Sequence, residues 1–345
     1  MKLLEGKVAL VTGSSTGIGA AVAIQLAKDG ANVVLVGRTE EKLYKVYEKI
    51  AAAGGKALVF ACDVTDKAAI SRLADTVKNK FGLCDFLING AGGNNPKATT
   101  DKEYFEIGDI EADTKSFFDL DAAGVGFVFN LNFLGTLIPT QVFAKDMAKK
   151  EGCSIINVSS MNSFRPLTKI PAYSAAKAGI SNFTQWLATH FAGTGIRCNA
   201  IAPGFLVSAQ NKALLFNDDG TPTARSAKIL NGTPMGRFVD SEELLGGLFF
   251  LTDDKAASAI TGPIATCLFR FQMNDPSGGV ASGMGTCGMV GPIGVYAGWV
   301  NDVAIGVKAS ITGMDWLAMA LICFILPAVL TWMIGILCRK LGWIK

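Results

Sequence analysis

Residues 7–19 read KVALVTGSSTGIG, and this stretch decides the fold. An apolar run of strand length leads into a glycine-rich turn, which opens GIGAAVAIQLAKDG, whose spacing predicts a helix ending at a glycine. Glycines at such a turn let the backbone approach a pyrophosphate, whose charge is favoured at the helix N-terminus. Because the spacing is GxxxGxG and not GxGxxG, a simple tight turn is the alternative interpretation.

Further strand-then-turn units follow in NVVLVGR, ALVFACDVTD, DFLINGAGG, CSIINVSS and IRCNAIAPG. Helical patterns lie between them. In one, Thr39 is a predicted N-cap, and Leu43, Val46, Tyr47 and Ile50 recur on one face. This alternation predicts an α/β domain with a doubly wound parallel sheet over residues 1–262. Ligands of such sheets bind beyond the carboxyl ends of the strands, where TGSSTG, DVTD, GAGG, VSS and APG lie.

Composition excludes some functions and disfavours others. The 345 residues carry a formal net charge of +3 without basic blocks, so nucleic-acid binding has no electrostatic support. The eight cysteines form no CxxC pair, which favours a reducing compartment, and with His190 as the one histidine we expect no metal site. The opening MKLLEGKVALVTG lacks the apolar run of a secretory signal.

Residues 101–121 interrupt the alternation of strands and helices, and in them eight acidic residues face two lysines. Such a charged stretch is typical of a solvated insertion between two elements of a fold. A mobile cover over the site is the alternative interpretation.

Residues 172–179, AYSAAKAG, place Tyr173 one helical turn before Lys177, so both polar groups project from one helix face. A free tyrosine has a pKa of about 10 and exchanges protons poorly near neutrality. A neighbouring ammonium favours the phenolate, so we expect Lys177 to lower the pKa of Tyr173. A pair of surface side chains is the alternative.

Taken in order, TGSSTGIG, CDVT, NGAG, NFLG, the serine and tyrosine–lysine positions, and the Pro-Gly turn resemble the short-chain dehydrogenases/reductases over residues 5–262. The resemblance implies hydride transfer between nicotinamide and a carbonyl carbon. It assigns catalysis to Asn132, Ser160, Tyr173 and Lys177. It assigns cofactor binding to Gly13, Ser15, Thr16, Gly17, Ile18, Gly19, Arg38, Asp63, Val64, Asn89, Ala91, Gly92, Pro203 and Gly204.

The resemblance also implies individual roles. Tyr173 exchanges the proton on the substrate oxygen, and Ser160 holds the carbonyl. Lys177 bonds the nicotinamide ribose, and Asn132 anchors a water that relays protons. A homo-oligomer is implied as well.

The end of the second predicted strand bears on the choice of cofactor. An acidic residue there would bind the ribose 2′-hydroxyl of NAD(H). Gly37 and Arg38 stand there instead, and they offer a 2′-phosphate room and a cation. We therefore predict NADP(H) in preference to NAD(H), with a solvated Arg38 as the alternative.

Within the family, GAGGNNPKATT, FNLNFLGTLIPTQVFAKDM and TPMGRF are similar to the D-mannonate oxidoreductase (fructuronate reductase) branch. That similarity implies a sugar acid as the small-molecule substrate. Amides and cations near the predicted strand ends would suit a polyhydroxy acid, although each alone could be a surface residue. The predicted substrate residues are Asn94, Asn95, Lys97, Asn162, Arg165, Gln210 and Asn211.

The C-terminal part departs from the family. The usual last strand is replaced by PIATCLFRFQMNDPSGG, in which residues 264–269 could take its place despite the proline before them. From residue 272 onward, about 75 residues resemble a fragment of a sugar permease of the phosphotransferase system, the EIIC type. A natural fusion and a rearranged gene are both compatible with this sequence.

Residues 316–337 form 22 residues without a charge, which as a helix would span about 33 Å. We predict a membrane helix there, a basic cytoplasmic tail at 338–345, and at 263–315 a Gly-rich linker or else a re-entrant or first membrane segment. A buried core helix is the alternative. These segments predict a reductase domain attached to the inner face of the membrane. Because both the domain and the tail are then cytoplasmic, the chain has to cross the membrane twice or not at all. A transport component with a fused dinucleotide-sensing domain is the competing function.

Overall fold

The computed structural model describes residues 3–207, 212–233 and 235–267. Their centre is a parallel sheet of seven strands in the order β3-β2-β1-β4-β5-β6-β7. The chain reverses direction of travel across the sheet between β3 and β4, as in doubly wound folds. The strands are β1 (Val8–Thr12), β2 (Asn32–Gly37), β3 (Lys56–Ala61), β4 (Phe86–Asn89), β5 (Ser154–Val158), β6 (Arg197–Pro203) and β7 (Ile264–Cys267).

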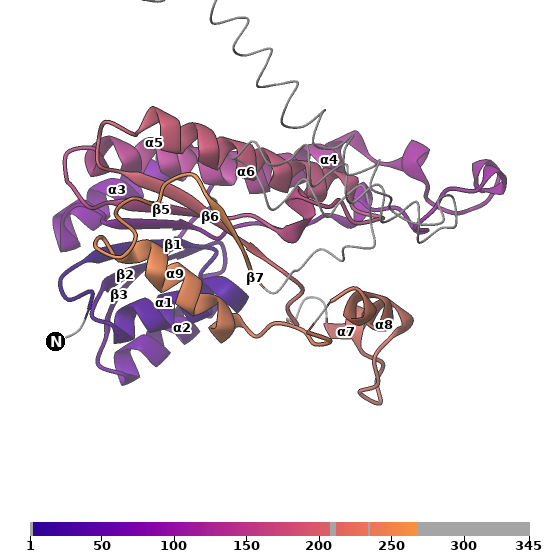
Figure 1. The fold of residues 1–345 in the computed structure, drawn as a ribbon, viewed down its shortest axis with the longest axis horizontal. Helices are drawn as coiled ribbons and strands as arrows, with labels where there is room; N and C mark the ends of the chain where they lie inside the picture. Colours follow the sequence, from indigo (N-terminus) through magenta and orange to yellow (C-terminus); the bar gives the residue numbers. More distant parts are fainter. Residues whose placement is uncertain (1–2, 208–211, 234, 268–345) are drawn as a thin grey trace, which may run out of the picture. The chain divides into compact units, whose positions relative to one another are not determined.

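Helices cover both faces of this sheet (Figure 1). On one face lie α1 (Gly17–Lys28), α2 (Glu40–Ala52) and α9 (Leu245–Thr252). On the other lie α3 (Lys67–Phe81), α5 (Gly135–Met147) and α6 (Pro171–His190). The predicted doubly wound α/β fold is therefore confirmed.

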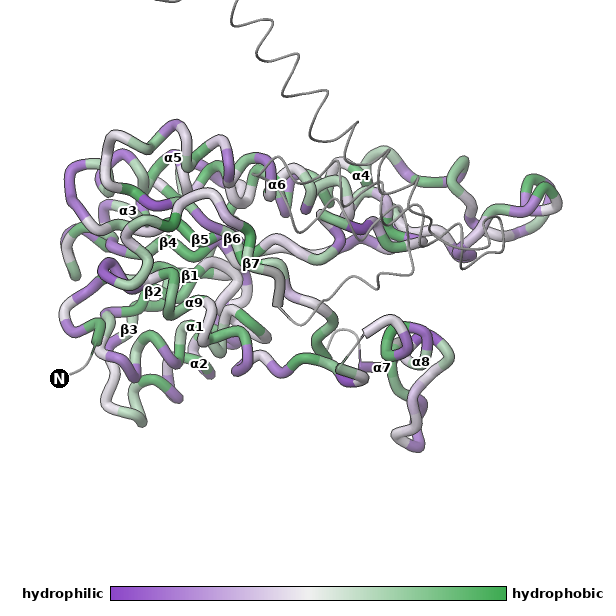
Figure 2. Tube along the Cα trace, in the orientation of Figure 1, coloured by the Kyte–Doolittle hydropathy of each residue, from purple (hydrophilic) through white to green (hydrophobic). Residues whose placement is uncertain are grey.

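The two-layer cover explains why the strands are apolar on both sides, as the hydropathy colouring in Figure 2 shows. Along β1, Ala9 and Val11 belong to the core under α1 and α2, whereas Val8 and Leu10 belong to the core under α3 and α5. Successive side chains of a strand point to opposite faces, so both sets are removed from water. The predicted helix face is correct at Leu43, Val46 and Ile50, which are buried, and wrong at Tyr47, which is 36% exposed.

The last strand is present. Ile264–Cys267 pairs in parallel with β6, and the carbonyl of Pro263 accepts a hydrogen bond from Ala200 N at 3.1 Å. Proline at this position is tolerated because it precedes the strand and contributes an acceptor, not a donor. Residues 264–267 of this segment therefore take the place of the final strand, and the predicted boundary at residue 262 is too early, because the sheet continues to residue 267.

One described helical run, Ala122–Met147, is long and apolar enough to cross a membrane by length and composition. It comprises α4 (Ala122–Phe129), a π-helical turn (Asn130–Leu134) and α5. Phe143, Ala144 and Met147 of this run are buried in the core against the sheet. In this fold the run is a covering helix. The membrane helix predicted at 316–337 lies outside the described residues, as do the tail and most of the preceding segment.

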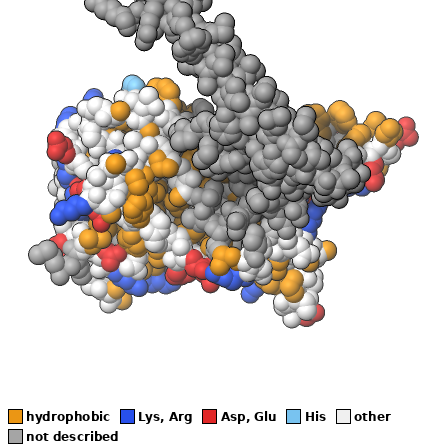
Figure 3. Space-filling model, viewed as in Figure 1, with side chains coloured by type: hydrophobic (Ala, Val, Ile, Leu, Met, Phe, Trp, Pro, Cys, Tyr) orange, Lys and Arg blue, Asp and Glu red, His pale blue; other side chains and the backbone are white. Residues whose placement is uncertain are grey.

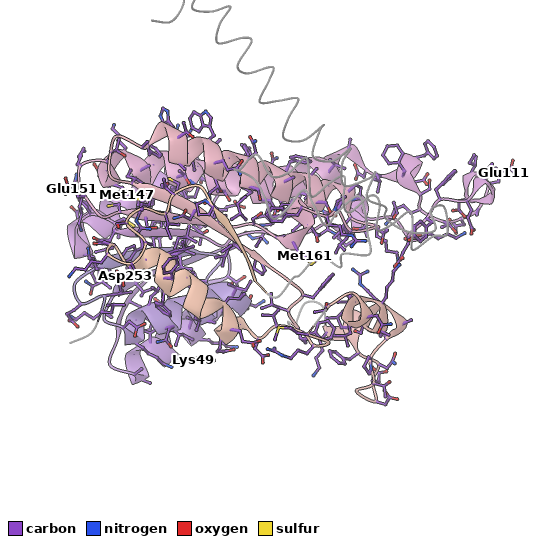
Figure 4. All side chains as sticks on the ribbon, viewed as in Figure 1. Lys49, Glu111, Met147, Glu151, Met161 and Asp253 are labelled. Carbon is purple, nitrogen blue, oxygen red and sulfur yellow. The ribbon has the colours of Figure 1, made fainter. Side chains whose placement is uncertain are left out.

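Two segments project beyond the carboxyl ends of the strands (Figure 1). One is the 101–121 insertion, whose tip carries Glu111 (Figure 4), and there hydrophobic and acidic side chains gather together (Figure 3). Its exposed apolar residues include Tyr104, Ile107 and Phe118. The other is a cap formed by α7 (Lys212–Leu215) and α8 (Ala224–Asn231).

Candidate active site

The glycine-rich turn after β1 is shaped by very close backbone contacts. Gly13 has a φ of +69°, and a Cβ built on it would lie 2.8 Å from the backbone of Ala91. A Cβ on Gly19 would lie 2.3 Å from the carbonyl oxygen of Gly13. Thr12 Oγ1 accepts hydrogen bonds from the amides of Gly90 and Ala91 at 3.1 and 3.2 Å. The backbone thus forms a cradle open to a ligand, which fits a dinucleotide pyrophosphate.

A cavity of about 640 Å³ lies along the carboxyl edge of the sheet and joins this turn to the end of β5 and the start of α6. Met161, the first residue of the 3₁₀ turn that follows β5, lines the cavity and is labelled in Figure 4. Almost all of the predicted cofactor residues line it: Gly13, Ser15, Thr16, Gly17, Ile18, Gly19, Arg38, Asp63, Val64, Ala91, Gly92, Pro203 and Gly204.

Asn89 does not line the cavity. Its side chain is buried in the sheet, where its amide nitrogen donates to Thr140 Oγ1 at 3.0 Å and to Asn157 Oδ1 at 2.9 Å. Asn157 in turn donates to Thr184 on α6 at 2.9 Å. The Asn89 side chain therefore links α5 to α6 by way of Asn157 on β5. It stabilises the elements that carry the site.

Helix α6 presents Tyr173 and Lys177 to the cavity, as their spacing predicts. Ser160, at the end of β5, lines it too and shares a hydrogen bond with the Tyr173 hydroxyl. Lys177 Nζ lies 5.8 Å from the centre of the Tyr173 ring and donates to Val158 O at 2.6 Å. The bond to Val158 fixes the ammonium beside the end of β5.

Asn132 sits in the π-helical turn between α4 and α5 and is fully buried. Its side chain accepts from Gly93 N at 3.2 Å and donates to Gly93 O and Val128 O at 2.7 and 2.8 Å. A π-helical turn is a common local distortion at functional sites. Here the turn directs the Asn132 amide toward the loop after β4. A Cβ built on Gly92 in that loop would lie 2.7 Å from Asn132 Oδ1 and 3.2 Å from Lys177 Nζ, so these two groups lie close to each other. The four predicted catalytic residues are thus brought together.

The charge states differ from the simple expectation. Burial raises the pKa of Tyr173, and its hydrogen bond with Ser160 opposes this rise. Burial also lowers the pKa of Lys177 to about 8. The expectation that the ammonium lowers the pKa of Tyr173 is therefore wrong for the protein without bound ligands, because removal of the phenol from water dominates. The neutral hydroxyl is the form ready to donate a proton.

Only some of the predicted substrate residues line the cavity. Asn162 lines the cavity, and its backbone N–H donates to Ser160 Oγ at 3.2 Å. Asn94 donates to Thr99 at 2.9 Å, Asn95 accepts from the backbone of Lys97 at 2.9 Å, and Lys97 pairs with Asp121 at 3.6 Å. None of these three lines the cavity, and neither does Arg165. Gln210 and Asn211 lie outside the described residues.

Several cavity residues carry no local sequence signal. Lys42 lies in the first turn of α2, and Arg225 lies on α8, between the Pro-Gly turn at 203–204 and TPMGRF but in neither of them. Their presence at the cavity depends on how α2 and the cap pack. Among the described residues there is no cluster of three or more His, Cys, Asp or Glu side chains that could hold a metal ion.

A family model for the short chain dehydrogenases matches residues 7–218. A second model, for the phosphotransferase system EIIC, matches residues 254–345, of which the described part (254–267) ends the sheet domain with β7. An uncharacterized oxidoreductase of Haemophilus influenzae is 55% identical over 261 residues, which cover 76% of this chain and 91% of the relative.

Solved structures agree with this match. A candidate D-mannonate oxidoreductase from Haemophilus influenzae with bound NAD is 55% identical, with a TM-score of 0.74, covering 76% of this chain and 94% of that one. A candidate 2-deoxy-D-gluconate 3-dehydrogenase from Agrobacterium tumefaciens with bound NADP is 32% identical, with a TM-score of 0.63, covering 76% and 95%. Similar chains therefore bind both dinucleotides.

Proposed function

This chain belongs to the short-chain dehydrogenases/reductases and is an NAD(P)-dependent oxidoreductase, and we propose that its substrate is a sugar acid of the fructuronate or mannonate type. The observation that carries the proposal is the assembled set of Asn132, Ser160, Tyr173 and Lys177 beside a cavity of about 640 Å³. The similarity of this chain to a candidate D-mannonate oxidoreductase favours a sugar acid as the substrate.

A bound nicotinamide supplies the hydride for a carbonyl carbon or accepts it from the corresponding alcohol. Ser160 donates a hydrogen bond that holds the carbonyl oxygen, and Tyr173 gives that oxygen its proton. The ammonium of Lys177 stabilises the phenolate that remains, until solvent returns the proton. The side chain of Asn132 keeps the loop after β4 in place beside Lys177.

We propose NADP(H) as the preferred dinucleotide. Arg38 and Lys42 both line the cavity after β2, where a Cβ built on Gly37 would lie 3.7 Å from the Ser15 side chain. Asp63 also lies there, but Thr65 N and Oγ1 hold its carboxylate at 2.8 and 2.7 Å. Two cations suit a 2′-phosphate. We expect Arg38→Gln to raise the KM for NADPH at least tenfold and to leave that for NADH within threefold; equal effects on both would contradict the preference.

The reaction is tested with the full-length protein, fructuronate and each reduced dinucleotide. We expect Tyr173→Phe to reduce kcat at least a hundredfold, since the proton donor is lost. Tyr44→Phe, at an exposed position on α2, is the matched control and leaves kcat unchanged. A Tyr173→Phe protein as fast as the parent excludes the mechanism. Turnover of simple aliphatic ketones but of no hexuronate excludes the substrate class.

We also propose that residues 316–337 attach the reductase domain to the inner face of the cell membrane. The charge-free stretch and the EIIC match support this proposal. Fractionation of cells that express the full chain tests it, and recovery only in the soluble fraction rejects it. The same EIIC match favours a second candidate, a phosphotransferase component that senses a dinucleotide. That candidate predicts dinucleotide binding without turnover of any sugar acid.

A further inference from the structure

The positively charged side chains around the cavity come from three parts of the fold. Four described cations line it, namely Arg38, Lys42, Lys177 and Arg225. Arg38 and Lys42 lie at the end of β2 and the start of α2, on the ribose side, and Lys177 is held by Val158 beside Tyr173. Arg225 alone comes from the cap, and the roles above leave it unused.

The cap holds Arg225 at the cavity through its own hydrogen bonds. Helix α8 begins after Thr223, whose hydroxyl accepts from Ser226 N at 3.3 Å. The buried Ser226 hydroxyl bonds to the carbonyl of Leu215 in α7. These bonds fix the first turn of α8, which carries Arg225. The half-buried Arg225 side chain therefore has a defined position in the cavity wall.

Glu103, an acidic group that acts on Arg225, already has another partner. Glu103 of the insertion forms an ion pair with Lys228, and Lys228 Nζ also lies 5.6 Å from the centre of the Tyr104 ring. Hydrogen bonding by Lys228 is the main cause that lowers the pKa of Glu103, and Arg225 contributes only a distant charge. Lys228 thus occupies Glu103, and Arg225 is left for a ligand.

We infer that Arg225 binds the carboxylate of the sugar-acid substrate, an inference that rests on the proposed function. The planar guanidinium matches a carboxylate with two parallel hydrogen bonds. Apolar side chains of Leu167, Ile170 and Phe205 line the same cavity and lower the competition from water. Arg225 therefore selects acids over neutral sugars of the same skeleton.

The test compares Arg225→Gln and Arg225→Lys with Lys228→Gln in the full chain. Lys228 is on the same helix but does not line the cavity, and its exposed ion pair contributes little energy. We expect Arg225→Gln to raise the KM for fructuronate at least tenfold and to leave the Kd of NADPH unchanged. Arg225→Lys recovers part of the loss, and Lys228→Gln changes the KM less than threefold.

Fructose, in which a hydroxymethyl group replaces the carboxylate, separates charge from shape. The ratio of kcat/KM for fructuronate to that for fructose falls at least tenfold in Arg225→Gln. A weaker Kd for NADPH would assign Arg225 to the cofactor, and an unchanged KM for fructuronate would overturn the inference while the proposed function stands. A parent protein that turns over no sugar acid overturns both.

Discussion

Gly92 gives the sharpest test of the site, because a methyl group there would displace two catalytic side chains. The Cβ of Gly92→Ala would lie 2.7 Å from Asn132 Oδ1 and 3.2 Å from Lys177 Nζ. To reach an ordinary contact of 3.4 Å, Asn132 Oδ1 has to move by roughly 0.7 Å. Its bond from Gly93 N is already 3.2 Å long and would be lost, since that length is at the limit for such bonds.

The effect on activity follows from this displacement. A misplacement of 1 Å at a site can reduce the rate about a hundredfold, so a displacement of roughly 0.7 Å reduces kcat by roughly 25-fold. The added methyl group costs about 1–3 kcal/mol of folding stability, which lowers Tm by about 2–4 °C for each kcal/mol. We therefore expect Gly92→Ala to lower kcat while the protein remains folded.

Gly93→Ala is the matched control. Its Cβ would meet only Leu131 Cδ2, at 3.6 Å, which is an ordinary contact. Both variants and the parent are compared by oxidation of NADPH with fructuronate, by the Kd of NADPH and by thermal unfolding. A parent-like kcat for Gly92→Ala, or an equal loss for Gly93→Ala, would refute the reasoning. An equal loss of NADPH affinity in both would show that the methyl groups obstruct the cofactor instead.

Three more predictions follow from other parts of the structure. Gly19→Ala places a Cβ 2.3 Å from Gly13 O, so it weakens dinucleotide binding at least tenfold, measured as Kd. Because burial lowers the pKa of Lys177 to about 8, its ammonium is present below that pH and is lost above it. The rate of carbonyl reduction should be level below pH 8 and fall above it, and a level profile up to pH 10 would contradict this role. Asp85→Ala removes the buried acceptor of Val8 N, a bond of 2.9 Å, and should lower the free energy of unfolding by about 1–3 kcal/mol in a urea titration.

Local spacing decided much of the site. Tyr173 and Lys177 are one helical turn apart, so they share a face wherever that helix lies. The glycine turn, the end of β4 and the end of β5 meet because parallel strands end at one edge of the sheet. These relations are properties of short segments and of strand order, and both can be derived from residue patterns.

The tertiary structure decided the rest, because it depends on contacts between distant segments. Asn94 and Asn95 find partners within their own loop, so amides predicted for the substrate are used to build that loop. Arg225 reaches the cavity only because the cap packs beyond the carboxyl ends of the strands. Burial reversed the expected direction of the pKa shift of Tyr173. Sequence alone specifies which groups are available, whereas folding sets their partners and how much water surrounds them.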